Sequence, residues 1–241
     1  MNILNISHHS FYPGENCQMN SATVQKKSLK KIPIIDNQEI APGAFVLSFK
    51  RDFLFIPGQV LAVTTHENIA PRLYSIASGA QDEEIRLLYT LKPDGELTPE
   101  LANLKTGDSL FVSGPTGKFF GIAGPSVWIA AGTGIAPFVS MWRSGLTKDK
   151  ILIHGSRFLH SFYFEYEFKN ALGDSFIRCC TKESGDGVFY GRVTQWLEQQ
   201  PTLWPDKKYY LCGSAEMVVE TRDILIDKGI SFDKILAEIY F

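Results

Sequence analysis

Hydrophobic and polar residues alternate in short runs over the first half of the chain. Turn-forming residues such as Pro57-Gly58 and Pro93-Asp94-Gly95 separate these runs. Because successive side chains of a strand point to opposite faces of a sheet, this alternation indicates half-buried strands. Short strands at regular spacing predict an antiparallel β-barrel. The expected strands are 44–49, 59–63, 71–78, 85–90 and 108–113.

The pattern changes after residue 126, where strand-like and helix-like runs alternate. Strand, helix and strand in repetition predict a parallel α/β sheet. The expected strands are 127–131, 150–154, 176–180 and 208–212, and the expected helices are 136–144, 162–172, 194–199 and 215–227. This change divides the chain into a flexible leader at 1–20, a barrel domain at 21–123 and an α/β domain at 124–241.

Composition and charge restrict the class of protein. Of the 241 residues, 44% are hydrophobic and 21% are charged, which is typical of a globular protein. The formal net charge of -2 argues against a nucleic-acid binder. No apolar run reaches membrane-spanning length, and residues 1–20 lack the features of a secretory signal. We therefore expect a cytoplasmic protein with neither a nucleic-acid nor a membrane partner.

The 4 cysteines lack the clustered spacing of iron–sulfur ligands. Two of them, Cys179 and Cys180, are adjacent and face opposite sides of a strand, which argues against a disulfide framework. The sequence thus predicts no metal centre. If the chain transfers electrons, its one-electron carrier is a separate molecule.

The strand at 71–78 carries the first candidate chemistry. Arg72 can hold a phosphate in a forked geometry, and Tyr74 can stack on a flat ring. Ser75 offers a hydroxyl that both donates and accepts a hydrogen bond. A phosphate-binding cation beside a stacking surface suits a flavin nucleotide, whereas the alternative is an ordinary barrel strand with a surface arginine.

Two turns that precede helices are candidate phosphate sites. Thr98 suits the N-cap of a short helix, with Pro99 at its first helical position. Gly132-Thr133-Gly134-Ile135-Ala136-Pro137 joins a buried strand to a helix, and its glycines let the backbone approach a ligand closely. Because the N–H groups of a helix N-terminus favour an anion, this second turn predicts a phosphate site, and its position after the first strand of the α/β half favours a dinucleotide.

Five motifs, in the same order along the chain, resemble those of the ferredoxin–NADP reductase family, in particular its bacterial single-chain FAD enzymes. They are Arg72-Leu73-Tyr74-Ser75, Gly95-Glu96-Leu97-Thr98, Gly132-Thr133-Gly134-Ile135-Ala136-Pro137, Leu211-Cys212-Gly213 and Ala237-Glu238-Ile239-Tyr240-Phe241. The resemblance runs from about residue 21 to the end of the chain. It implies a six-stranded antiparallel barrel that binds FAD, followed by a parallel α/β domain that binds NADP(H).

The same resemblance assigns roles around FAD. Arg72 clamps the pyrophosphate, Tyr74 stacks on the flavin, and Tyr240 covers the opposite ring face. Phe241 stands where bacterial members usually have Trp, and it keeps an aromatic ring but loses the indole donor. The residues assigned to FAD are Arg72, Leu73, Tyr74, Ser75, Leu87, Leu88, Tyr89, Thr90, Glu96, Leu97, Thr98, Thr133, Tyr240 and Phe241.

For the second nucleotide, the resemblance implies that Arg157, Lys182 and Arg192 bind the 2′-phosphate of NADP. Lys182 replaces the usual arginine with a point charge, so the preference for NADP over NAD is expected to be less steep. The residues assigned to NADP(H) are Gly132, Gly134, Arg157, Thr181, Lys182, Tyr190, Arg192 and Gly213.

The hydride-transfer neighbourhood implied by the resemblance consists of Ser75, Cys212, Glu238 and Tyr240. Cys212 alone is more typical of a buried structural thiol. Residues 235–240 alone are more typical of a final strand. The resemblance, rather than either residue pattern, therefore carries the catalytic assignment.

Together the motifs imply a ferredoxin/flavodoxin–NADP(+) reductase, an oxidoreductase that transfers hydride between NADP(H) and FAD. A separate ferredoxin or flavodoxin gives or takes single electrons, and the family expectation is a monomer. The alternatives are an NAD(P)H-dependent reductase component of an oxygenase, a free-flavin reductase, and a non-catalytic electron-transfer flavoprotein subunit. The identity of the carrier and the physiological direction stay open.

Overall fold

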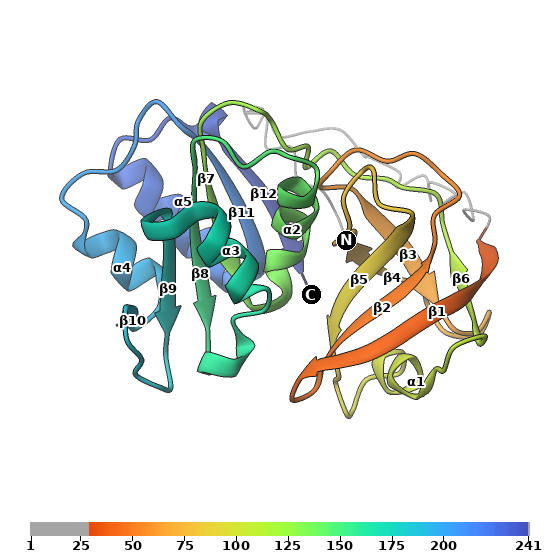
Figure 1. Cartoon of the computed structure of the whole chain (residues 1–241). Coiled ribbons are helices and arrows are strands. Elements are labelled where there is room, and N and C mark those ends of the chain that lie inside the picture. Colours follow the sequence, from red (N-terminus) through yellow and green to blue (C-terminus); the bar gives the residue numbers. More distant parts are fainter. Residues whose placement is uncertain (1–28, 241) are drawn as a thin grey trace, which may run out of the picture.

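The computed structural model describes residues 29–240, in which two sheets of 6 strands each stand side by side (Figure 1). The predictions for the leader at 1–20 and for Phe241 lie outside the described residues. No helix within residues 29–240 is long and apolar enough to cross a membrane.

The first sheet is antiparallel throughout, in the strand order β4-β3-β6-β1-β2-β5. Its outer strands meet where Ile76 bridges Leu87 and the Ala77 N–H donates to the Arg86 carbonyl at 2.8 Å. The sheet therefore closes into the predicted six-stranded barrel. Its elements are β1 Lys30–Ala41, β2 Ala44–Lys50, β3 Val60–Thr64, β4 Arg72–Ser75, β5 Glu84–Thr90, α1 Thr98–Asn103 and β6 Ser109–Val112.

The second sheet is parallel throughout, in the order β10-β9-β8-β7-β11-β12. Chain order runs outward from β7 in both directions, so the carboxyl end of β7 is the topological switch point at which open α/β sheets bind ligands. Its strands are β7 Ser126–Ala131, β8 Lys150–Ser156, β9 Phe176–Cys180, β10 Val188–Tyr190, β11 Lys208–Ser214 and β12 Ile235–Tyr240.

Helices cover both faces of the parallel sheet because alternate residues of its strands point to opposite sides. In β7, Val127 and Ile129 pack with Leu225 of α5, whereas Trp128 packs with Phe138 of α2. The α-helices are α2 Ala136–Arg143, α3 Glu165–Leu172, α4 Val193–Gln199 and α5 Ala215–Asp227. The short 3₁₀ helices are η1 Gly132–Ile135, η2 Leu159–Ser161, η3 Gly173–Ser175 and η4 Phe232–Lys234.

The two halves share one buried core. Leu88 of the barrel belongs to the same apolar cluster as Phe138 and Tyr210 of the α/β half. The Tyr210 hydroxyl donates to the Phe120 carbonyl at 3.0 Å, and Arg143 pairs with Asp82 at 3.6 Å. These contacts fix the angle between the halves and therefore the shape of the space between them.

Two strands were absent from the sequence prediction. In β1 only two apolar residues, Ile32 and Ile34, are buried, and Pro33 separates them, so the alternation is too short to mark a strand of 12 residues. At the sheet edge, β10 has only 3 residues. The strand expected at 208–212 as the fourth of this half is therefore the fifth, β11, because β10 precedes it. It also continues past Cys212 to Ser214.

Two predicted helix starts were wrong. Leu97, not Thr98, occupies the N-cap of α1, and the Thr98 hydroxyl instead accepts a hydrogen bond from the Lys92 N–H at 2.8 Å. Helix α3 begins at Glu165 rather than at residue 162, because Phe164 has a left-handed backbone with φ of 60°. Hydrophobicity alone carries no signal for such a backbone reversal.

Candidate functional site

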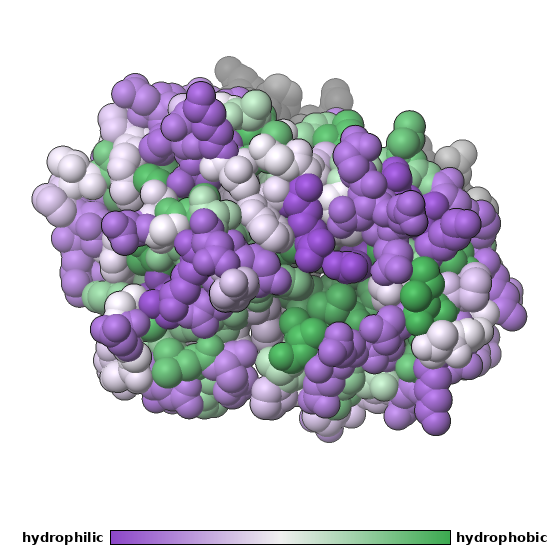
Figure 2. All heavy atoms as spheres, viewed as in Figure 1, coloured by the Kyte–Doolittle hydropathy of each residue, from purple (hydrophilic) through white to green (hydrophobic). Residues whose placement is uncertain are grey.

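A cleft of about 1360 Å³ separates the barrel from the carboxyl ends of the parallel strands. In the space-filling view, an apolar area lies in the hollow between the two halves and is bordered by hydrophilic residues (Figure 2). Single-ligand pockets usually hold about 300–1,000 Å³. The cleft therefore has room for more than one nucleotide, and both halves of the chain contribute to its walls.

Strand β4 forms one wall of the cleft. Arg72 is exposed there, and among residues 29–240 no carboxylate lies within ion-pair distance of its guanidinium. The Tyr74 ring packs edge-on against Tyr89, with 6.4 Å between centroids. Burial raises the pKa of Tyr74 to about 12, so its phenol stays protonated. The wall thus presents a cation ready for an anion beside an aromatic ring.

Most of the residues predicted to bind FAD line this cleft. They are Arg72, Leu73, Tyr74, Ser75, Leu88, Tyr89, Thr90, Glu96, Leu97, Thr98, Thr133 and Tyr240. Leu87 does not line it, because its side chain is buried inside the barrel and its backbone bridges Ile76. Alternation along β5 explains the difference, since Leu88 points out of the barrel while Leu87 points in.

The glycine-rich turn after β7 forms η1 at the topological switch point. Gly132 lines the cleft with a φ of +53°, and nothing lies within 4 Å of the position a Cβ would take. By contrast, a Cβ on Gly134 would lie 2.1 Å from the Cys212 carbonyl oxygen. Gly134 therefore serves the packing of η1 on β11, and it is not among the cleft-lining residues.

A histidine that the sequence prediction missed supports the same turn. His154 is fully buried at the end of β8, and its Nε2 lies 3.1 Å from the Gly132 carbonyl oxygen. Burial lowers the pKa of His154 to about 4, so the ring is neutral at physiological pH. A neutral ring can donate from Nε2 to Gly132 and thereby hold the turn in place.

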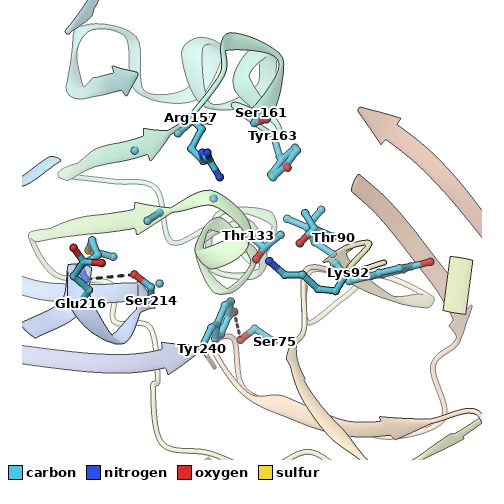
Figure 3. Close-up of a pocket in the computed structure, with 18 of the residues that line it drawn as sticks. Ser75, Thr90, Lys92, Thr133, Arg157, Ser161, Tyr163, Ser214, Glu216 and Tyr240 are labelled. Carbon is cyan, nitrogen blue, oxygen red and sulfur yellow. Dashed lines mark hydrogen bonds between the residues drawn. The ribbon is translucent and has the colours of Figure 1, made fainter. Parts of the chain in front are cut away.

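The last strand brings the two halves into direct contact at the cleft. The Tyr240 hydroxyl donates to Ser75 Oγ at 2.7 Å (Figure 3). The Ser75 hydroxyl in turn donates to Glu238 Oε2 at 2.9 Å. Cys212 of β11 lies beside Glu238 as its register partner. The four residues predicted as a hydride-transfer neighbourhood therefore lie together, with Cys212 and Glu238 behind the cleft-lining Ser75 and Tyr240.

Burial shifts the acid–base properties of this group. Desolvation raises the pKa of Glu238 to about 7, and the hydrogen bond from Ser75 partly opposes the shift. Desolvation also raises the pKa of the Cys212 thiol well above its usual value, with the Glu238 carboxylate adding to the effect. Cys212 is therefore a neutral thiol, whereas Glu238 can gain or lose a proton near neutral pH.

Replacing Glu238 by glutamine is expected to stabilise the protein more at pH 8 than at pH 5. A pKa near 7 in the folded chain against 4.5 when solvated means that rising pH deprotonates the unfolded state first. The buried carboxylate then costs about 3 kcal/mol above pH 7, and Glu238→Gln removes that cost while keeping an acceptor for Ser75. Denaturant unfolding of the parent and the variant at pH 5 and pH 8 measures the change in the free energy of unfolding. The exposed Glu198→Gln is the control. A stability difference that does not change with pH contradicts the buried ionisation.

The cations predicted to bind a 2′-phosphate also gather at one end of the cleft. Arg157, Lys182 and Arg192 all line it, together with Gly132, Thr181 and Gly213. Tyr190 is not among the lining residues, and 63% of its surface is exposed on the edge strand β10. Turns that follow β8, β9 and β10 carry the three cations to the same sheet edge.

Several cleft residues had no signal in the sequence motifs. Figure 3 shows Lys92 from the barrel, Ser161 and Tyr163 before α3, and Ser214 and Glu216 at the start of α5. Met217 and Glu220 of α5 line the cleft as well. The alternation of strands and helices could have placed Ser214 and Glu216, because both follow the carboxyl end of a predicted strand.

The donors present fit a flavin nucleotide and a nicotinamide nucleotide. An exposed arginine and a tyrosine ring share one wall, and three cations with a glycine turn share the other. Within residues 29–240 no cluster of three or more His, Cys, Asp or Glu could hold a metal ion. The cations and the glycine turn suit organic cofactors that carry phosphate groups.

Comparison with known proteins agrees with a flavin-binding barrel followed by a nicotinamide-nucleotide-binding α/β half. Residues 32–120 match the oxidoreductase FAD-binding domain family, and residues 128–223 match the oxidoreductase NAD-binding domain family. A ferredoxin NADP+ reductase from Neisseria gonorrhoeae, solved with FAD and NADP, superposes with a TM-score of 0.81 over 89% of this chain and 99% of that one. At 22% identity, this likeness shows the fold.

Two curated relatives belong to different electron-transfer systems by name. The toluate 1,2-dioxygenase electron transfer component of Pseudomonas putida is 28% identical over 80% of this chain, but the match spans only 62% of that relative's length. A flavodoxin/ferredoxin–NADP reductase of Rhodobacter capsulatus is 36% identical over 66% of this chain and 69% of the relative. With FAD-binding and NAD-binding domains in this order and a relative at this identity, the chain belongs to the ferredoxin/flavodoxin–NADP reductase family of oxidoreductases.

Proposed function

We propose that this chain is a ferredoxin/flavodoxin–NADP(+) reductase. It catalyses hydride transfer between NADP(H) and FAD, and a separate ferredoxin or flavodoxin gives or takes single electrons. The observation that carries the proposal is the chain of hydrogen bonds from Tyr240 through Ser75 to Glu238, because it joins the two cofactor walls at one point. A cytoplasmic location and a monomeric state stay predictions.

The residues of the chain have distinct roles in this proposal. Arg72 binds the FAD pyrophosphate, and Tyr74 stacks on the flavin. FAD, when bound, supplies the ability to exchange two electrons with a nicotinamide and one electron at a time with a protein carrier. Ser75 orients the Tyr240 hydroxyl and the Glu238 carboxyl, and Glu238 holds or releases a proton because its pKa lies near 7.

In this proposal, residues 21–123 form the FAD-binding domain and residues 124–241 form the NADP(H)-binding domain. Residues 32–120 and 128–223, the two matched regions, fall inside these limits. The chain order of the two units brings β12 back to the barrel, so that the end of the second unit contacts the first.

A second candidate is the reductase component of an oxygenase. The similarity to the toluate dioxygenase component, which extends over more of this chain than the match to the Rhodobacter reductase, favours it. The two candidates differ in the electron acceptor, and not in the chemistry of the cleft. Transfer to purified ferredoxin and flavodoxin, compared with transfer to an oxygenase ferredoxin, separates them.

Anaerobic titration of the FAD-loaded protein with NADPH is expected to bleach the flavin absorbance at about one equivalent of NADPH per FAD. The reduced protein is then expected to reduce an added ferredoxin or flavodoxin. Bleaching without transfer to any carrier contradicts the carrier assignment. No bleaching while FAD stays bound contradicts the proposed activity and favours a non-catalytic electron-transfer subunit.

A further inference from the structure

The cation end of the cleft also contains acidic side chains. Arg192 Nη1 lies 3.2 Å from Glu216 Oε1 and 3.8 Å from Glu220 Oε2, and all three residues line the cleft. We propose that Glu216 and Glu220 set the selectivity of the enzyme between NADP(H) and NAD(H), an inference that rests on the function proposed above. They hold Arg192 away from a 2′-phosphate and accept hydrogen bonds from an unmodified ribose, so that the enzyme uses NADH as well as NADPH.

The backbone fixes where Arg192 can reach. The N–H of Gly191 donates to the Cys180 carbonyl at 2.8 Å, and the N–H of Arg192 donates to Gln195 Oε1 at 2.8 Å. A Cβ on Gly191 would lie 2.6 Å from the Phe189 ring, and the φ of +152° there also favours glycine before Arg192. The guanidinium therefore starts from a defined position opposite α5.

Helix α5 presents the two carboxylates from the other side. Glu216 and Glu220 are four residues apart, which places both on one face of the helix. The Met217 N–H donates to Ser214 Oγ at 3.4 Å and so caps the helix just before Glu216 (Figure 3). Both carboxylates thus come from a regular element, and Arg192 lies within ion-pair distance of each.

The charge balance of this end of the cleft differs from that of a site built for a 2′-phosphate alone. Arg157, Lys182 and Arg192 supply three positive charges, and Glu216 and Glu220 subtract two. Among residues 29–240, no carboxylate lies within ion-pair distance of Arg157 or Lys182. A 2′-phosphate must therefore compete for Arg192 with two carboxylates and also meets their repulsion.

An unmodified ribose has no such conflict. A carboxylate accepts hydrogen bonds from ribose hydroxyls, and dinucleotide-binding folds use an acidic side chain on the ribose 2′-hydroxyl to recognise NAD, there from the end of an earlier strand. The Arg192 side chain is 59% exposed and the glutamates are 68% and 43% exposed, so water and salt screen the pairs. We therefore expect each glutamate to change selectivity by about three- to fivefold rather than to abolish binding of either nucleotide.

The test compares the FAD-loaded parent with Glu216→Gln, Glu220→Gln and the double variant. Calorimetry measures the Kd for 2′,5′-ADP and for 5′-AMP, which differ only in the 2′-phosphate. Each single substitution is expected to tighten the binding of 2′,5′-ADP by about three- to fivefold and to leave the binding of 5′-AMP unchanged or weaker. The double variant is expected to bind 2′,5′-ADP about tenfold more tightly than the parent. Glu198→Gln on α4, outside the cleft, controls for net charge.

Kinetics give a second measurement on the same proteins. The ratio of kcat/KM for NADPH to that for NADH is expected to rise by the same factors as the ratio of binding constants. An unchanged 2′,5′-ADP affinity in the double variant overturns the selectivity role. So does a parent whose flavin is reduced by NADPH and not by NADH. If the parent binds both fragments as expected but neither dinucleotide bleaches the flavin, the proposed function fails while the selectivity role stands.

Discussion

Replacing Arg72 by alanine is expected to weaken FAD binding by about 100-fold, because one or two charged hydrogen bonds are lost. The Arg72 side chain faces the cleft and has no carboxylate partner within residues 29–240. Its removal therefore breaks no internal ion pair, and the loss falls on the ligand. Fluorescence quenching of FAD by the apoprotein measures the Kd directly.

Two further variants separate this effect from a general loss of charge. Arg86→Ala removes another barrel arginine, which lies outside the cleft beside Glu84, and it is expected to keep FAD. Arg72→Lys keeps the charge but not the forked donors, so an intermediate affinity is expected. FAD retention by Arg72→Ala equal to that of the parent would remove this residue from the flavin site.

Elements with strong local patterns were predictable from the sequence. Strand β9 and helix α5 occupy the expected ranges, because continuous apolar residues or a helical stripe bounded by turn residues leave few alternatives. The edge strand β10 and the polar strand β1 were not predictable in this way. They form because a neighbouring strand supplies hydrogen bonds, and that information lies elsewhere in the chain.

The same distinction between local patterns and long-range contacts holds for the residues of the site. Motifs of contiguous residues identified Arg72, Tyr74 and the turn at Gly132, all of which line the cleft. The packing role of Gly134 was not predictable in this way, since a Cβ there would clash with the carbonyl of Cys212 on another strand. The pairing of Arg192 with Glu216 was not predictable either, because it joins a turn and a helix that only the folded sheet brings together.

The replacement of Ser75 by alanine is expected to slow flavin reduction by NADPH about 100-fold while FAD stays bound, at the low end of what positioned proton-handling groups contribute. Ser75 is 2% exposed and accepts from Tyr240 while it donates to Glu238. Alanine therefore leaves the Tyr240 hydroxyl without its acceptor and Glu238 without its donor. Stopped-flow absorbance measures the rate, and Ser126→Ala, a buried serine without a hydrogen-bond partner among the described residues, is the control.

The pH profile distinguishes this role from a loss of packing. The Ser75 hydrogen bond lowers the pKa of Glu238, so Ser75→Ala is expected to move the rate profile to higher pH from its midpoint near 7. A slower reaction with an unmoved midpoint contradicts a role through Glu238.

A double-mutant cycle then asks whether Tyr240, Ser75 and Glu238 act as one unit. Tyr240→Phe removes the hydroxyl at the other end of the hydrogen-bond chain and keeps the ring. If Ser75 works by joining Tyr240 to Glu238, adding Tyr240→Phe to Ser75→Ala slows the reaction little further, because residues that act together lose their effect together. Two effects that multiply in full would show that Tyr240 and Ser75 contribute independently, and that their hydrogen bond serves only to dock β12 on the barrel.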